Sequence, residues 1–128
     1  MIKCSAVTPQ HSIVFIADMD SDVEVPADTS AATVTFTDSC VAVWTLPEDE
    51  GPTTVCISDS EASDLIVVFD GSIRAPNGLL SIHTSDHEVI LSCGVPRGTV
   101  PAKVLVDDLQ YPGRIALVIP GLRRQVDL

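Results

Sequence analysis

Short apolar segments separated by turn-forming residues are the feature that most constrains what this chain can fold into. Segments that are apolar throughout, or that alternate apolar with polar positions, lie at 12–17, 33–37, 40–46, 53–58, 65–69, 78–83, 88–93, 102–106 and 114–119. Turn residues such as Asp49-Glu50-Gly51-Pro52 and Pro112-Gly113 lie between them. Valine, isoleucine and threonine supply 17, 10 and 10 residues, or 37 of 128, and β-branched residues favour strands. The pattern predicts an all-β fold, an antiparallel β-sandwich or flattened barrel of about eight strands with little helix.

Two of these segments, Leu65–Phe69 and Ile115–Ile119, are apolar at every position. Such runs are typical of central strands that are covered on both faces. The pairs Asp70-Gly71 and Arg97-Gly98 carry turn residues, so we expect each pair to lie between strands.

One long segment, residues 18–32, shows no apolar period. We expect it to form a crossover loop between sheets, with one helical turn capped by Asp28 or Thr29. No internal repeat and no second apolar unit is visible, so residues 1–128 are predicted to form a single β-sandwich domain.

Apolar runs in this chain are short. The longest have five residues, whereas a membrane-spanning helix needs about 20. The first residues also lack the basic segment and apolar run of a secretory signal. We therefore expect a soluble cytoplasmic protein with no membrane partner.

The charge is strongly negative and unevenly divided. Residues 1–70 carry 13 acidic residues and one basic residue, Lys3, for −12, while residues 71–128 carry 5 acidic and 6 basic residues, for +1, which gives −11 in total. Nucleic-acid binding depends mainly on Lys and Arg at phosphates, so nucleic acid is not expected as a partner. A basic protein partner would be attracted by the same field. The alternative is that the acidity only keeps the domain soluble.

The four cysteines, Cys4, Cys40, Cys56 and Cys93, include no C-x-x-C pair, so no structural zinc site is predicted. Without an export signal, free thiols are expected. Cys56 and Cys93 lie in apolar segments and are expected to pack in the core, whereas Cys40 is expected to be the most exposed.

Acidic residues alternate along one segment, where Asp18, Asp20 and Asp22 resemble the start of an EF-hand calcium loop. The glycine and glutamate that this motif requires further along are missing, so the motif fails. Carboxylates two apart on an extended chain face one side, and Glu24 continues the row. We expect a solvated acidic loop, with contact to a partner protein or calcium binding as alternatives.

Two histidines, His83 and His87, flank a predicted turn between two strands. Across such a hairpin their rings can approach each other. With Glu88 they are competent ligands for a transition metal, but no third ligand is indicated, so surface histidines are expected and no metal is predicted. An alternative is a small ligand held between loops by these histidines and Arg97.

No catalytic signature is present. None of the serines lies in a G-x-S-x-G turn, so the chain is not predicted to be an enzyme and no cofactor is expected. Trp44, the only tryptophan, is expected to pack in the core.

Several segments resemble the C-terminal half of the competence protein J family, mainly over residues 65–128. The matching order is strand, Gly-x-Ile/Val-x-Ile strand, apolar strand, Leu-Pro-x-Gly turn and final strand. It is carried here by Leu65–Phe69, Pro76–Ile82, Glu88–Leu91, Val95-Pro96-Arg97-Gly98 and Ala102–Val106. Cys40–Trp44 and Thr53–Ile57 also suit a strand pair in that pattern. The chain departs from the family after the turn, where Thr99-Val100-Pro101 replaces the usual aromatic residue.

The resemblance implies a small acidic β-sandwich that binds and inhibits a nuclease. A cleft that attracts phosphates should also attract an acidic cluster. We favour Glu48, Asp49 and Glu50 over the 18–24 cluster, because they are expected at the tip of a hairpin between segments 40–46 and 53–58, and loops commonly carry binding. The predicted function is an inhibitor-type protein-binding module. A small-ligand-binding sandwich and a self-associating homo-oligomer are the alternatives.

Overall fold

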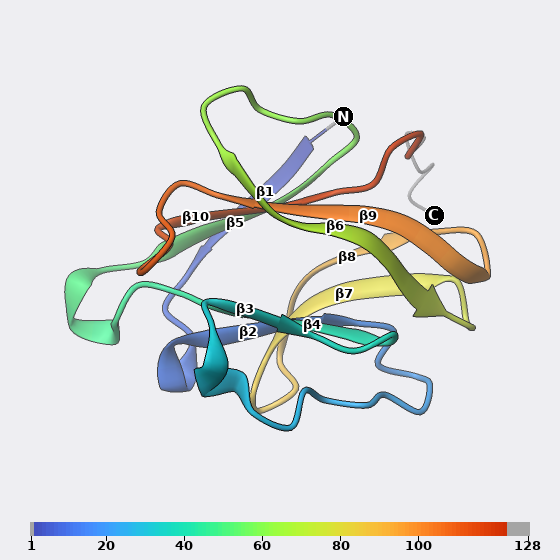
Figure 1. Cartoon of the computed structure of the whole chain (residues 1–128), viewed down its shortest axis with the longest axis horizontal. Coiled ribbons are helices and arrows are strands. Elements are labelled where there is room, and N and C mark those ends of the chain that lie inside the picture. Colours follow the sequence, from blue (N-terminus) through green and yellow to red (C-terminus); the bar gives the residue numbers. More distant parts are fainter. Residues whose placement is uncertain (1, 123–128) are drawn as a thin grey trace.

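Two five-stranded β-sheets packed face to face make up this molecule (Figure 1). The computed structural model describes residues 2–122. Sheet A contains, in spatial order, β1 (Ile2–Val7), β5 (Thr53–Ser58), β10 (Arg114–Val118), β9 (Gly98–Val106) and β6 (Ile66–Ala75). Sheet B contains β3 (Val34–Phe36), β4 (Cys40–Trp44), β2 (Ile13–Ala17), β7 (Leu79–Thr84) and β8 (Val89–Gly94). The only helical segments in residues 2–122 are the short 3-10 helices η1 (Gln10–Ser12), η2 (Thr29–Ala31) and η3 (Glu48–Glu50). The predicted all-β sandwich is confirmed.

Strand number and direction differ in part from the prediction. The described residues form ten strands rather than about eight, and β1 was not among the predicted segments. All neighbouring pairs are antiparallel except β5 and β10, which run parallel. An apolar pattern reports which side chains are buried and carries no information on the direction of a neighbouring strand.

The core lies between the sheets and is filled by aliphatic side chains from alternate positions. β10 is a central strand, as predicted, and its alternate residues Ile115 and Leu117 pack against the inward side chains of sheet B. The other face of β10, with Ala116 and Val118, is buried beneath Leu65. Both faces are therefore covered, which explains the continuous apolar run.

β6 is an edge strand, so the central position predicted for Leu65–Phe69 is wrong. Ile66 and Val67 are 44% and 43% exposed, and the register shifts between Val67 and Phe69. The strand also continues through Asp70-Gly71, where a turn was expected, as far as Ala75. A Cβ built on Gly71 would lie 3.1 Å from the ring of Phe69, so glycine here provides room for that ring.

The turn expected at Arg97-Gly98 precedes β9, but the strand begins at Gly98, earlier than the predicted segment 102–106. Pro101 lies inside β9 opposite Ser72 of the edge strand β6.

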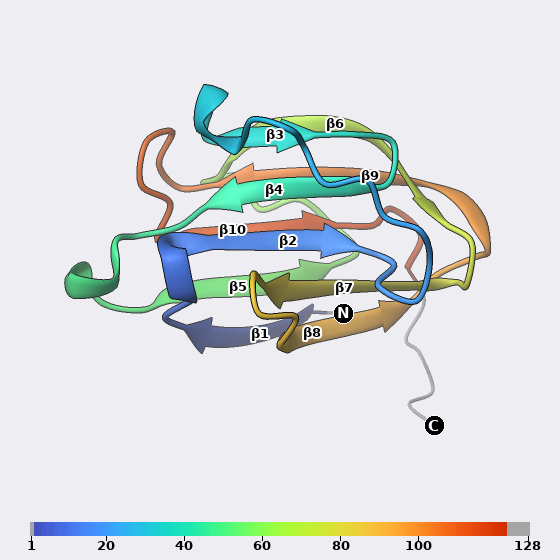
Figure 2. The same cartoon turned by 90° about the horizontal axis from the view of Figure 1, so that it is seen from below.

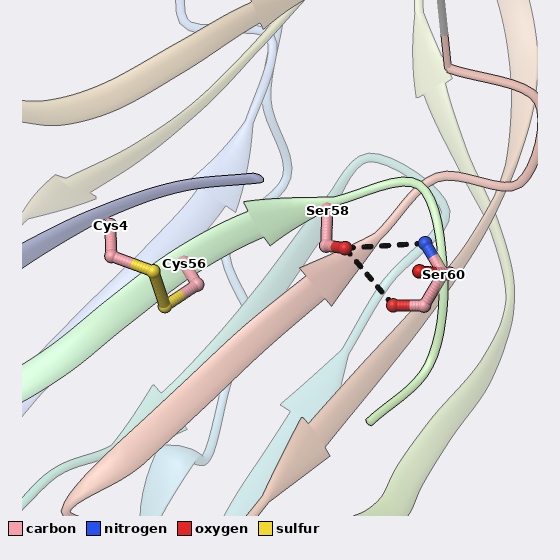
Figure 3. The surroundings of a disulfide bond; sticks show 4 residues. All are labelled: Cys4, Cys56, Ser58 and Ser60. Atoms are coloured by element: carbon pink, nitrogen blue, oxygen red, sulfur yellow. Dashed lines mark hydrogen bonds between the residues drawn. A yellow bond between two sulfur atoms is a disulfide. The ribbon is translucent and has the colours of Figure 1, made fainter. Parts of the chain in front are cut away.

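Two of the four cysteines are bonded, which corrects the expectation of free thiols. Cys4 of β1 lies directly opposite Cys56 of β5, and the two form a disulfide on sheet A (Figure 3). Beside it, the Ser58 hydroxyl donates to the carbonyl of Ser60 at 3.0 Å and accepts from the Ser60 N–H at 3.2 Å (Figure 3). A direct cross-strand position brings the sulfurs together.

Cys40 and Cys93 are free and buried. Burial raises the pKa of the Cys40 thiol to about 12 and that of Cys93 to about 11. Cys93 thus packs in the core as predicted, whereas the expectation that Cys40 is exposed is wrong.

The 18–32 segment is a loop, but it joins β2 to β3 within sheet B, so the expected crossover between sheets is wrong. Figure 2 shows it passing across the outer side of sheet B. Its helical turn η2 is capped by Asp28, whose carboxylate accepts the Ser30 N–H at 3.0 Å. The Trp44 indole Nε1 donates to the carbonyl of Thr29 at 2.7 Å, so Trp44 anchors the loop and is half-buried outside the core. No helix in residues 2–122 has the length and hydropathy required to cross a membrane.

Candidate protein-binding surface

The acidic helix η3 projects from one end of the sandwich, at the far left of Figure 1. Glu48, Asp49 and Glu50 are all exposed. The expected hairpin is wrong, because β4 belongs to sheet B and β5 to sheet A, so the segment crosses from one sheet to the other. The His11 N–H donates to Glu48 Oε1 at 3.1 Å and holds η3 against η1. Glu48, Asp49 and Glu50 therefore lie in a connecting loop that is held against η1, and they do not form the tip of a hairpin.

Two further carboxylates lie beside Glu48. Asp86 and Glu88, from the β7–β8 turn, line a hollow of about 240 Å³ together with Glu48 and the polar residues Thr8 and Gln10. The sequence pattern indicates Glu88 only as a possible metal ligand beside the histidines and gives no signal for Asp86. Their approach to Glu48 depends on the strand pairing, which places the β7–β8 turn beside η1 and η3.

The loop between β9 and β10 adds two more acids at this end of the molecule (Figure 1). Asp108 Oδ1 accepts the N–H groups of Tyr111 at 3.0 Å and Gln110 at 2.7 Å, and these backbone hydrogen bonds lower the pKa of Asp108. Asp107 Oδ1 accepts the N–H groups of Gly113 and Arg114 at 2.9 and 3.0 Å. Both carboxylates are therefore held in fixed positions.

We call this surface the acidic end. It comprises the exposed residues Glu48, Asp49, Glu50, Asp86, Glu88, Asp107 and Asp108. Arg114, the basic residue that follows this loop, is paired with Asp64 at 2.7 Å. Seven carboxylates at one end can attract a basic surface.

The other predicted cluster is the acidic row at positions 18–24, in which one residue is buried and three are exposed. Asp18 is fully buried, and its carboxylate accepts the N–H groups of Asn77 at 2.7 Å and Asp20 at 3.3 Å. Asp18 is therefore not available to a partner, which corrects its place among the predicted contact residues. Asp20, Asp22 and Glu24 are exposed, but they follow the end of β2 that lies opposite η1 and η3 (Figure 2). The two predicted clusters do not form one surface.

The β7–β8 hairpin brings the two histidines together as predicted, with ring centroids 6.2 Å apart. His83 is not a surface residue, since it is 7% exposed and stacks on Phe15 at 5.9 Å. Burial, with a smaller contribution from the charge of His87, lowers the pKa of His83 to about 4. His83 is therefore neutral at physiological pH.

The small-ligand constellation of His83, His87 and Arg97 is not assembled. His83 lies near the end of β7 and His87 in the turn that precedes β8, whereas Arg97 follows the far end of β8. Within the described residues, no group of three or more His, Cys, Asp or Glu side chains is arranged to hold a metal ion.

Comparison with known proteins gives a clear result for the fold. No protein-family model matches the sequence, and no curated protein matches it. Among solved structures, the chain is similar to ComJ from Bacillus subtilis, an inhibitor of the DNA degrading activity of NucA. The TM-score is 0.63 at 12% identity, over 94% of this chain and 98% of that chain.

A second solved structure, described as crocagin biosynthetic gene J, matches with a TM-score of 0.55 at 16% identity. The match covers 94% of this chain and 97% of that chain. The resemblance predicted from the sequence is thus confirmed for the fold, and it extends well beyond residues 65–128. The chain is similar in fold to ComJ over nearly its whole length.

Proposed function

We propose that this chain is a protein-binding module that inhibits a basic enzyme, with a nuclease as the class of partner. The observation that carries the proposal is the similarity of fold to ComJ, an inhibitor of a DNA-degrading activity, over 94% of the chain. The net charge of −11 and the acidic end support it, because a phosphate-binding cleft on the partner is positively charged.

The acidic end would act by occupying that cleft in place of DNA. Glu48, Asp107 and Asp108 are each held by main-chain N–H groups, so the free protein already presents them in fixed positions. Preorganised carboxylates lose less conformational entropy when a partner binds. Binding would be fast and sensitive to salt, because opposite charges steer the encounter.

The testing experiment is a pull-down from lysate of the source cells, with tagged protein and stepwise elution by salt. The test bait carries Glu48→Gln, Asp49→Asn and Glu50→Gln. The matched control bait carries Asp20→Asn, Asp22→Asn and Glu24→Gln, which remove the same charge at the opposite end.

We expect one basic protein to be retained by the wild type and the control, to be lost from the test bait, and to degrade DNA unless the chain is added. Retention by all three baits, or capture of a protein that the chain does not inhibit, would contradict the proposal. Light scattering on the chain alone tests the alternative of self-association, which predicts a mass above 13.6 kDa.

A further inference from the structure

A cavity of about 570 Å³ opens beside the acidic end. Its walls come from segments far apart in the sequence, namely η1, the ends of β3 and β4, and the β9–β10 loop. Its lining includes His11, Thr33, Trp44, Pro47, Gln110 and Tyr111. None of its lining residues, all within the described part of the chain, is a lysine or an arginine.

Two aromatic residues form part of the wall; Trp44 is held through its side chain and Tyr111 through its main chain. Trp44 donates its indole N–H to the carbonyl of Thr29 at 2.7 Å, so its polar group is already satisfied. Tyr111 is 50% exposed, and its N–H is bound by Asp108 at 3.0 Å. The Thr33 hydroxyl donates to the carbonyl of Leu109 and pins the same loop to the start of β3. These hydrogen bonds fix the Trp44 side chain and the loop that carries Tyr111.

Two carboxylates lie next to residues that line the cavity. Glu48 is bound to the N–H of His11, a lining residue, and follows Pro47, which also lines the cavity. In the β9–β10 loop, Asp108 accepts the N–H groups of the lining residues Gln110 and Tyr111. Only Oδ1 of Asp108 takes part in these two bonds.

Aromatic walls and flanking carboxylates are the chemistry that recognises a cationic side chain. A guanidinium group stacks on an aromatic face and binds a carboxylate through two parallel N–H groups, whereas an ammonium group is a compact, strongly hydrated charge. Trp and Tyr are also enriched among the residues that dominate binding energy at interfaces.

We propose that the Trp44–Tyr111 cavity binds an arginine side chain that projects from the basic partner. This names the anchor point of the interface and rests on the proposed function for the identity of the partner. The cavity's preference for arginine can be measured without that partner, because it is a property of this chain alone.

The test uses the only tryptophan of the chain as the reporter. The full-length protein is titrated with hexa-arginine, hexa-lysine and hexa-glutamate while Trp44 fluorescence is recorded. We expect a saturable change with hexa-arginine, a weaker one with hexa-lysine and none with hexa-glutamate.

Tyr111→Ala separates the cavity from general attraction between charges, because it leaves the net charge unchanged. It should weaken hexa-arginine binding about fivefold, because one aromatic contact to the cation is lost. The matched control is Leu109→Ala, which removes a 59% exposed side chain from the same loop outside the cavity. Circular dichroism checks that both variants are folded.

Equal hexa-arginine affinity for the wild type and Tyr111→Ala, or no response of Trp44, would overturn the inference. The two proposals fail separately. Specific peptide binding with no inhibited enzyme would remove the proposed function alone, whereas an inhibited enzyme that binds Tyr111→Ala as tightly as wild type would remove the arginine anchor alone.

Discussion

The main-chain N–H of Asn77 donates to Oδ2 of Asp18 at 2.7 Å, across 59 residues of sequence. Oδ1 of the same buried carboxylate accepts the N–H of Asp20, so Asp18 joins the end of β2 to the turn between β6 and β7. An acid that was expected on the surface therefore holds two parts of the sandwich together.

Asp18→Ala should lower the free energy of unfolding by about 2 kcal/mol, because it removes a buried carboxylate that accepts two main-chain N–H groups. Asp20→Asn, at an exposed position, should change it by less than about 0.5 kcal/mol. Urea unfolding at neutral pH measures both. Equal stability of the two variants would show that the Asp18 hydrogen bonds contribute little.

The disulfide between Cys4 and Cys56 ties β1 to sheet A and closes a loop with a sequence separation of 52. Replacing both cysteines by serine should lower stability by about 2 to 4 kcal/mol, since a bridge of this span restricts the unfolded chain. Guanidinium unfolding with and without reductant measures the loss. A wild type that is equally stable in both conditions would contradict the expectation.

Thiol chemistry gives an independent check on the cysteines. Alkylation of the protein prepared without reductant, followed by mass spectrometry, should find Cys40 and Cys93 modified only after unfolding, and Cys4 and Cys56 only after reduction. Prompt modification of Cys40 in the native protein would contradict its burial.

His83 should make the stability depend on pH. Above about 6.5 it is neutral in the folded and unfolded states and has no effect. As the pH falls from 6.5 to about 4, only the unfolded state binds the proton, because burial lowers the pKa of His83 in the folded state to about 4. Stability should therefore fall in this window, by about 1 to 2 kcal/mol after allowance for solvent screening.

His83→Gln should remove that component of the pH profile, whereas His11→Gln, at an exposed position, should retain it. Thermal unfolding of the three proteins between pH 7 and pH 4 makes the comparison. Parallel profiles for the wild type and His83→Gln would be inconsistent with a buried neutral histidine.

Local pattern predicts most of the strands but not how they pair. The apolar segments at 12–17 and 114–119 became β2 and β10, because burial of alternate or consecutive side chains is a local property. The sequence placed 40–46 and 53–58 in one hairpin, yet β4 and β5 lie in different sheets. Partner choice depends on contacts across the whole core, which a single segment does not encode.

In the candidate site too, local features could be predicted from the sequence, whereas contacts between distant segments could not. Exposure of Glu48 followed from its polar, turn-rich surroundings, and the structure agrees. The burial of Asp18 depends on Asn77, and the approach of Asp86 to Glu48 depends on sheet topology. Asn77 is far from Asp18 in the sequence, and Glu48 is far from Asp86, so the local sequence pattern does not indicate either contact.

The most direct test of the account is the inhibition constant of the chain for the basic enzyme recovered by pull-down, measured with the two charge variants at opposite ends. Glu48→Gln/Asp49→Asn/Glu50→Gln should weaken inhibition about tenfold at low salt, from roughly 0.5 kcal/mol per exposed charge. The Asp20→Asn/Asp22→Asn/Glu24→Gln variant should inhibit as wild type does. Equal inhibition by both variants, or a loss confined to the second, would contradict binding through the acidic end.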